Sequence, residues 1–172
     1  MIEGGVGGAS TLTGLAFERD TSLKLAISNL RGYRVAGDAV YQGNNLIGTL
    51  LSKGSLYSRL LAPRGVDYRN IVSKKLLPDD AFLNLTNQTL YIIEKKYQQC
   101  AGSVDEKLQT CDFKAKQYRK LLSPLNIEVE YIYVLNDWFL HDSYRDVLEY
   151  ITSVNCSYYF ERIPLEVLGL TE

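Results

Sequence analysis

The chain has 172 residues, of which 46% are hydrophobic and 23% are charged, and its formal net charge at neutral pH is -1. This composition is typical of a single packed domain over 1–172, and it excludes a disordered tail, a collagen-like rod and a disulfide scaffold. The charge argues against a broad basic surface for nucleic acid, but it leaves room for a local basic cleft.

The first third of the chain predicts a helix, a strand and a less regular segment. Apolar residues at helical spacing predict a helix over about 11–31, and a strand follows over 33–42. Residues 46–64 are apolar and partly helical in pattern, but glycines and a proline interrupt them. The helical spacing is set by Ala16, Leu23, Ile27 and Leu30.

The middle of the chain predicts a hairpin and a long helix. Strand-like runs over 80–85 and 90–98 are joined by a short polar segment, which is the pattern of a β-hairpin. A capping box over 103–106 begins a helix that Pro124 ends. The apolar stripe of this helix is Val104, Leu108, Cys111, Ala115, Tyr118 and Leu122.

The last third of the chain predicts a central strand followed by smaller elements. Residues 127–135 change from alternating to continuously apolar, as a strand does when both of its faces are covered. A helix near 143–154, a strand near 157–161 and a helical turn after Pro164 complete the chain. The order of elements predicts an α/β fold with helices on a mixed sheet.

The cysteines and the N-terminal residues bear on the cellular compartment. Cys100, Cys111 and Cys156 form no CxxC pair, and with the single His141 they make no zinc set. Residues 1–13 lack the basic and apolar regions of a secretory signal, and no apolar run is long enough to span a membrane. We therefore expect reduced thiols in a cytoplasmic protein without a membrane partner.

The pattern of greatest chemical interest lies on the predicted hairpin. It is Pro78-Asp79, then fourteen residues, then Glu94-Lys95-Lys96. With a turn centred on residues 87–88, Asp79 faces Lys96, and Glu94 lies two residues before it on the same face. The same alternation adds Gln98 to this face and turns Asp80 away from it. A loop of odd length would exchange Asp80 for Asp79, so the choice between these two aspartates stays open.

These residue types suit the hydrolysis of a phosphodiester. Two neighbouring carboxylates repel each other unless a cation lies between them, and oxygen ligands select a hard ion such as Mg²⁺. The backbone carbonyl of Lys95 can complete such a site, and the Lys96 ammonium can hold or help deprotonate the attacking water. The alternative is a set of solvated charges on an edge strand. The apolar run over 90–93 is typical of an interior strand and favours a site.

The pattern, on a hairpin between two helices and before a further strand, resembles the PD-(D/E)XK nuclease superfamily. Gly14-Leu-Ala-Phe17-Glu18 is similar to the Gly-x-x-Phe-Glu signature of its restriction and Holliday-junction branches. Phrases such as Glu94-Lys-Lys-Tyr-Gln98 and Gly102-Ser-Val-Asp-Glu-Lys-Leu-Gln-Thr-Cys111 resemble bacterial type II restriction endonucleases. The resemblance covers about 11–135 and leaves 136–172 as C-terminal additions.

The resemblance implies a restriction-endonuclease-like mixed sheet with an α-β-β-β-α-β core. It implies that Asp79 and Glu94 bind Mg²⁺, that Lys96 positions the water, and that Glu18 and Gln98 assist. The implied activity is a DNA endonuclease whose products carry 5′-phosphate and 3′-hydroxyl ends.

The resemblance also implies partners. The substrate is double-stranded DNA, and the short chain leads us to expect either a homodimer or a larger subunit that reads the DNA sequence. Lys107 and Lys114, seven residues apart on the predicted helix, can face phosphates, although a solvated helix face is an equally good interpretation. The alternative function is a non-catalytic DNA-binding or interaction subunit on the same scaffold.

Overall fold

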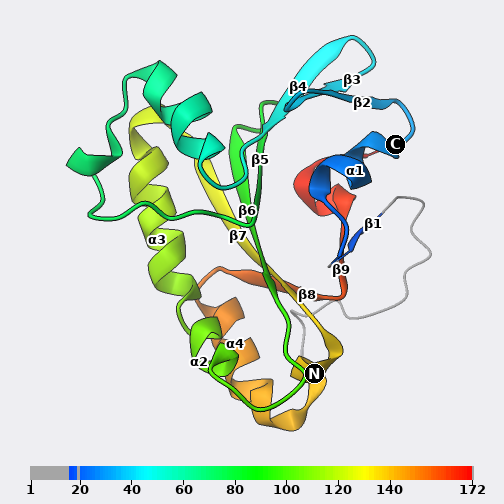
Figure 1. The fold of residues 1–172 in the computed structure, drawn as a ribbon, viewed down its shortest axis with the longest axis vertical. Coiled ribbons are helices and arrows are strands. Elements are labelled where there is room, and N and C mark those ends of the chain that lie inside the picture. The colour runs from blue at the N-terminus through cyan, green and yellow to red at the C-terminus, as the bar shows by residue number, and fades with distance from the viewer. Residues whose placement is uncertain (1–15, 19, 172) are drawn as a thin grey trace.

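A seven-stranded mixed sheet is the centre of the computed structural model, which describes residues 16–18 and 20–171 (Figure 1). Its strand order is β2-β3-β4-β5-β6-β7-β8, antiparallel from β2 to β6 and parallel from β6 to β8. The strands are β2 (Tyr33–Ala36), β3 (Ala39–Gln42), β4 (Asn45–Leu50), β5 (Asp80–Asn84), β6 (Thr89–Lys96), β7 (Glu128–Leu135) and β8 (Ser157–Phe160). A separate antiparallel pair joins β1 (Ala16–Glu18) to β9 (Arg162–Pro164).

Helices cover both faces of this sheet and enclose two apolar cores. The α-helices are α1 (Leu23–Ser28), α2 (Val104–Leu108), α3 (Cys111–Leu122) and α4 (Arg145–Ser153). One core packs α3 and α4 on one face, and the other packs α1 and the turn Leu165–Leu168 on the opposite face. The other short turns are Leu56–Leu61, Ala62–Arg64, Tyr68–Asn70, Ser123–Leu125, Asp137–Leu140 and Asp142–Tyr144. No helix in the described part of the chain is long and apolar enough to cross a membrane.

The predicted α/β class and the elements predicted for the last third of the chain are confirmed. The strand predicted over 127–135 is β7, which lies between β6 and β8 and is buried along most of its length. The helix predicted near 143–154 is α4, and the strand near 157–161 is β8. The crossover from β6 through α3 to the parallel strand β7 is the arrangement that the order of elements predicted.

The helix predicted over 11–31 is confirmed only over Leu23–Ser28, the bounds of α1. Residues 16–18 form β1, and the helix begins only after Ser22, whose hydroxyl accepts a hydrogen bond from the backbone N–H of Leu25 at 3.1 Å. This cap fixes the start of α1 at Leu23, because an N-cap residue has extended rather than helical backbone. Glu18 therefore lies on a strand, opposite Arg162 of β9, and not on the first helix. Gly14 of the signature and the Glu18 side chain lie outside the described part of the structure.

Two other predicted elements are divided. The strand predicted over 33–42 is the hairpin β2–β3, which turns at Gly37 with a positive φ of 63°. The helix predicted from 103–106 onwards is divided into α2 and α3 at Gln109 and Thr110, and Ser103 makes no side-chain cap bond. Its predicted apolar stripe is nevertheless buried, since Leu108, Cys111, Ala115, Tyr118 and Leu122 are each at most 1% exposed.

Candidate active site

The β5–β6 hairpin positions the residues of the sequence pattern. Ala81 lies opposite Ile92, not opposite Glu94, so the register differs by two residues from the prediction. Continuing the register by one residue places Asp79 opposite Glu94. The difference arises in the turn, where Asn84 and Asn87 accept hydrogen bonds from backbone N–H groups two residues further on. Because the shift is even, every side chain keeps its predicted face.

The two neighbouring aspartates lie on opposite faces of the sheet. Asp79 accepts a hydrogen bond from the backbone N–H of Lys95 at 3.0 Å. The Pro78 carbonyl accepts from the Lys53 N–H instead, so the Asp79 carboxylate is the acceptor for the Lys95 N–H beyond the start of β5. Asp80 instead pairs with the Lys95 ammonium at 3.2 Å, and burial raises the pKa of Asp80 although Lys95 opposes the shift. Asp79 is thus the aspartate on the Glu94 face.

Glu94 is the buried centre of the candidate site. Its side chain is 8% exposed, and its Oε2 lies 3.1 Å from the Lys96 Nζ and 3.9 Å from the Lys114 Nζ. We call Asp79, Glu94, Lys96 and Lys114 the carboxylate–lysine cluster. A buried carboxylate loses hydration, and the two lysine ammonium groups offset this loss at Glu94.

The two lysines predicted to face DNA have different positions. Lys114 lies on α3 and reaches Glu94, whereas Lys107 lies on the separate helix α2 and is exposed. The break at Gln109 and Thr110 removes the continuous helix on which their shared face depended. The structure therefore brings Lys114 into the cluster and leaves Lys107 on the surface.

Gln98 lies beyond the end of β6 rather than on the strand. Its backbone N–H donates to the Asn136 Oδ1 at 3.1 Å, and the Asn136 Nδ2 donates to the Gln98 carbonyl at 2.8 Å. The Gln98 side chain is buried, and neither of its amide atoms has a hydrogen-bond partner among the described residues. Asn136 fixes this position, and the sequence pattern did not identify it.

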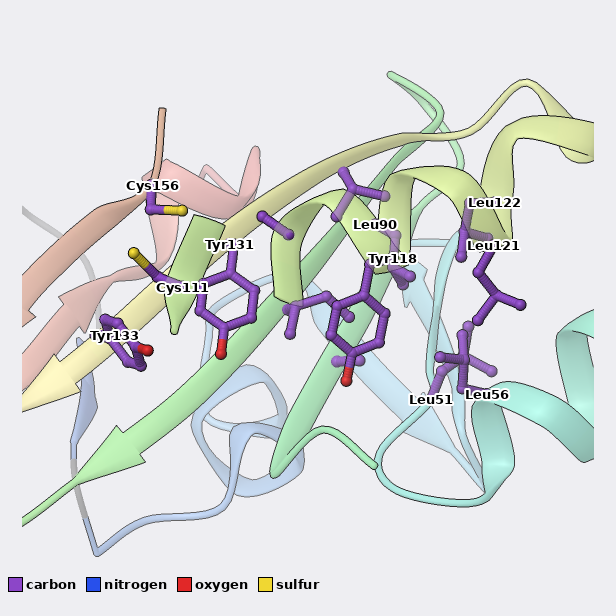
Figure 2. Close-up of a cluster of buried hydrophobic side chains, with 14 of the residues drawn as sticks. Leu51, Leu56, Leu90, Cys111, Tyr118, Leu121, Leu122, Tyr131, Tyr133 and Cys156 are labelled. Carbon is purple, nitrogen blue, oxygen red and sulfur yellow. The ribbon is translucent and has the colours of Figure 1, made fainter. Parts of the chain in front are cut away.

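Three buried tyrosines form the wall behind Glu94. Figure 2 shows Tyr118, Tyr131 and Tyr133 along one face of the sheet, with the hydroxyls of Tyr118 and Tyr131 directed to the same side. Burial raises the pKa of Tyr118, and the charges of Glu94 and Asp79 raise it further. The Tyr118 hydroxyl therefore stays neutral, whereas the Tyr133 hydroxyl is held by the carbonyls of Lys107 and Leu108 at 3.2 Å and 3.4 Å. Their spacing on the strand predicted over 127–135 and on the apolar stripe of the predicted helix was the available signal for this wall.

The donor atoms of the cluster suit a hard divalent cation. Among the described residues, no three His, Cys, Asp or Glu side chains gather as a metal site. Mg²⁺ needs only one or two carboxylates because it keeps several waters, whereas structural zinc takes four nitrogen or sulfur ligands. The carboxylates of Asp79 and Glu94, with the main chain of Lys95 between them, fit Mg²⁺ better than zinc.

Comparison with known proteins gives no family for this chain. No family model matches it, and no curated protein and no solved structure matches it either. The interpretation of the site therefore depends on its geometry and on the chemistry of its residues.

Proposed function

We propose that the protein is a Mg²⁺-dependent DNA endonuclease of the type II restriction class, with a PD-(D/E)XK site. The observation that carries the proposal is the buried Glu94 with the Lys96 ammonium at 3.1 Å, on the same face as Asp79 at the end of two adjacent strands. Two carboxylates and a lysine at one strand end are the groups that hydrolysis of a phosphodiester requires.

The order of elements supports the same proposal. Strands β4, β5 and β6 form an antiparallel meander, and α3 then leads to β7, which lies parallel to β6. The strands β2 and β3 lie between α1 and β4, so the chain has two more strands than the proposed α-β-β-β-α-β core, and we propose that α1, β4–β6, α3 and β7 correspond to that core.

Each residue of the cluster has a distinct proposed role. Asp79 and Glu94 would hold Mg²⁺ with the Lys95 carbonyl, and the ion would polarise the phosphoryl oxygen. Lys96 would orient the attacking water and hold a proton at its Nζ. Lys114 would offset the negative charge that develops on the phosphate.

Glu18 and Gln98 are proposed to assist these groups. We further propose that the substrate is double-stranded DNA and that the protein acts in the cytoplasm. It would act as a homodimer or with a larger subunit that reads the sequence.

Cleavage of supercoiled plasmid DNA with Mg²⁺ tests the proposal. We expect nicked or linear products with 5′-phosphate and 3′-hydroxyl ends, made by the chain alone or with a candidate partner subunit. Asp79→Ala and Lys96→Ala should each abolish cleavage, whereas the exposed Lys116→Ala should retain it. If both cluster variants cut as the wild type does, the assigned site is wrong. DNA binding without cleavage under any condition would support the non-catalytic alternative instead.

A further inference from the structure

The segment 53–75, which we call the basic arm, differs in charge from the rest of the chain. It holds six of the 19 Lys and Arg residues and one of the 20 Asp and Glu residues, so it carries +5 and the remaining chain carries -6. All six basic residues are exposed: Lys53, Arg59, Arg64, Arg69, Lys74 and Lys75. This concentration of positive charge in an otherwise acidic chain creates a local attraction for a polyanion.

The basic arm is anchored to the body of the protein by its apolar side. Leu56 is fully buried in the core under α3. The Tyr57 hydroxyl donates to the Leu76 carbonyl at 2.9 Å and accepts from the Leu76 N–H at 2.8 Å. At its start, the Lys53 N–H donates to the Pro78 carbonyl at 2.9 Å. The basic arm is therefore packed against the rest of the domain, and its basic side chains face the solvent.

These contacts place the basic arm next to the carboxylate–lysine cluster. Pro78, which accepts the hydrogen bond from Lys53, immediately precedes Asp79. Figure 1 shows the arm, in teal, beside the C-terminal end of α3, and its last residues return to the start of β5. If one phosphate of a polyanion lies at the carboxylate–lysine cluster, the phosphates next to it would therefore contact the basic arm.

The basic arm also has a concave surface, a cavity of about 590 Å³. The Lys75 ammonium lies 5.1 Å and 5.0 Å from the ring centroids of Tyr57 and Tyr68. Arg69 also lines the cavity and pairs with the Asp67 carboxylate at 2.8 Å, so the acidic residue of the arm is neutralised. The lining keeps a net positive charge beside aromatic surface, which suits the sugar-phosphate chain of a nucleic acid.

We infer that the basic arm binds the phosphate backbone of double-stranded DNA beside the cleavage site. The inference rests on the proposed function, which places a phosphodiester at the carboxylate–lysine cluster. Exposed Lys and Arg side chains neutralise phosphates without reading bases, so the arm supplies affinity rather than sequence specificity. The neutral charge of the whole chain is then compatible with DNA binding, because the positive charge is concentrated in this segment.

Fluorescence anisotropy with a labelled DNA duplex tests the inference in EDTA, where cleavage cannot occur. The test variant combines Lys53→Gln, Arg64→Gln and Lys74→Gln, three exposed positions that leave the ion pairs of Arg59 and Arg69 in place. We expect its affinity to fall by about 10-fold to 100-fold at moderate salt, because each lost phosphate contact removes counterion release. The slope of log affinity against log salt should become shallower by about 0.9 for each contact.

A matched variant removes the same charge elsewhere. Lys24→Gln, Arg31→Gln and Arg34→Gln alter exposed residues in and around α1 and β2, and this variant should bind DNA nearly as the wild type does. An equal loss in both variants would overturn the inference, as would wild-type binding by the arm variant or no measurable DNA binding by the wild type. Equal competition by polyglutamate or by duplex RNA would also overturn it.

The outcomes separate the inference from the proposed function. Arm-dependent DNA binding by a protein that never cleaves would support the inference and remove the nuclease proposal. Mg²⁺-dependent cleavage by the arm variant, with an unchanged KM and unchanged DNA affinity, would support the nuclease proposal and overturn the inference about the basic arm.

Discussion

Two clusters of charged residues lie back to back at the same end of β5 and β6, one on each face of the sheet. On the face covered by α1, Asp80 and Lys95 form a single ion pair at 3.2 Å. On the face covered by α3, the buried Glu94 lies between two ammonium groups, from Lys96 at 3.1 Å and Lys114 at 3.9 Å. The same hairpin therefore builds both clusters from adjacent residues of one chain.

The two clusters differ in their expected roles. The pair on the α1 face connects elements of the fold, whereas the cluster on the α3 face is proposed to act on the substrate. Lys95 also donates to the Thr21 carbonyl at 3.0 Å, so the Asp80–Lys95 pair ties β6 to the segment before α1. The α3 face instead gathers Asp79, Glu94 and two lysines at one strand end, which are the groups that the proposed hydrolysis requires. We therefore expect substitutions on the α3 face to remove activity and substitutions on the α1 face to reduce stability.

The largest effect is expected for Glu94→Gln. This change keeps the shape of the side chain and an acceptor for Lys96, but it removes the charge that we propose holds the cation. Cleavage of plasmid DNA with Mg²⁺ should slow by about 1,000-fold. The free energy of unfolding, measured by urea titration, should fall by no more than about 3 kcal/mol, because Lys96 and Lys114 lose a carboxylate but keep an amide oxygen as acceptor. A large loss of stability with cleavage retained would show that Glu94 serves the fold rather than the reaction, and would contradict the assigned difference between the two faces.

Asp80→Ala should show the opposite behaviour. It removes the ion pair between Asp80 and the Lys95 ammonium, whose side chain is 22% exposed. The free energy of unfolding should fall by about 1–3 kcal/mol, between the values for exposed and fully buried pairs. Cleavage per folded molecule should stay within a few-fold of the wild type. A loss of cleavage as deep as that of Glu94→Gln would show that the two faces act together.

Lys114→Gln tests the outer member of the cluster. Because its Nζ lies 3.9 Å from the Glu94 carboxylate and not in direct hydrogen-bond contact, we expect a loss of about 10-fold in the cleavage rate. Lys116 lies on the same helix, pairs with Asp112 at 2.7 Å and is 67% exposed, so Lys116→Gln is the matched control. Equal rates for the two variants would remove Lys114 from the site.

The smallest effect concerns pH. Burial raises the pKa of Asp80 in the folded protein, with the attraction of Lys95 opposing the shift. As the pH falls towards the ordinary aspartate pKa of about 4, the folded state takes up this proton before the unfolded state does. Asp80 therefore stabilises the fold more at low pH, and this contribution is lost as the pH rises through the raised pKa. Urea titrations should show the stability difference between the wild type and Asp80→Asn shifting in favour of the wild type on acidification. A pH-independent difference would contradict the raised pKa.

The faces of the candidate site could be predicted from the sequence, although its register could not. The two-residue period of a strand fixes which side chains share a face, and the even shift in the hairpin left Asp79 and Glu94 together. The shift itself depends on hydrogen bonds of Asn84 and Asn87 within the turn, which residue spacing does not reveal. Likewise, the contact between Lys114 and Glu94 depends on how α3 packs on the sheet.

The less regular segment shows where sequence patterns were insufficient. Glycines and a proline made 46–64 ambiguous, and the segment proved to be most of β4 and the first half of the basic arm. The positive charge of this segment could not be linked to the candidate site from the sequence, because the link depends on the fold, which holds Lys53 beside Pro78 and Asp79. The helix predicted over 11–31 failed for a local reason, because Ser22 caps a shorter helix that follows a strand.

The most direct test of the account compares two neighbouring lysines on opposite faces of β6. Lys95→Gln and Lys96→Gln differ by one position, remove the same charge and are assayed on supercoiled plasmid with Mg²⁺. The account predicts that the Lys95→Gln protein cuts DNA at a rate near that of the wild type, and that the Lys96→Gln protein does not cut. Cleavage by Lys96→Gln at the rate of Lys95→Gln would contradict the assignment of the active face.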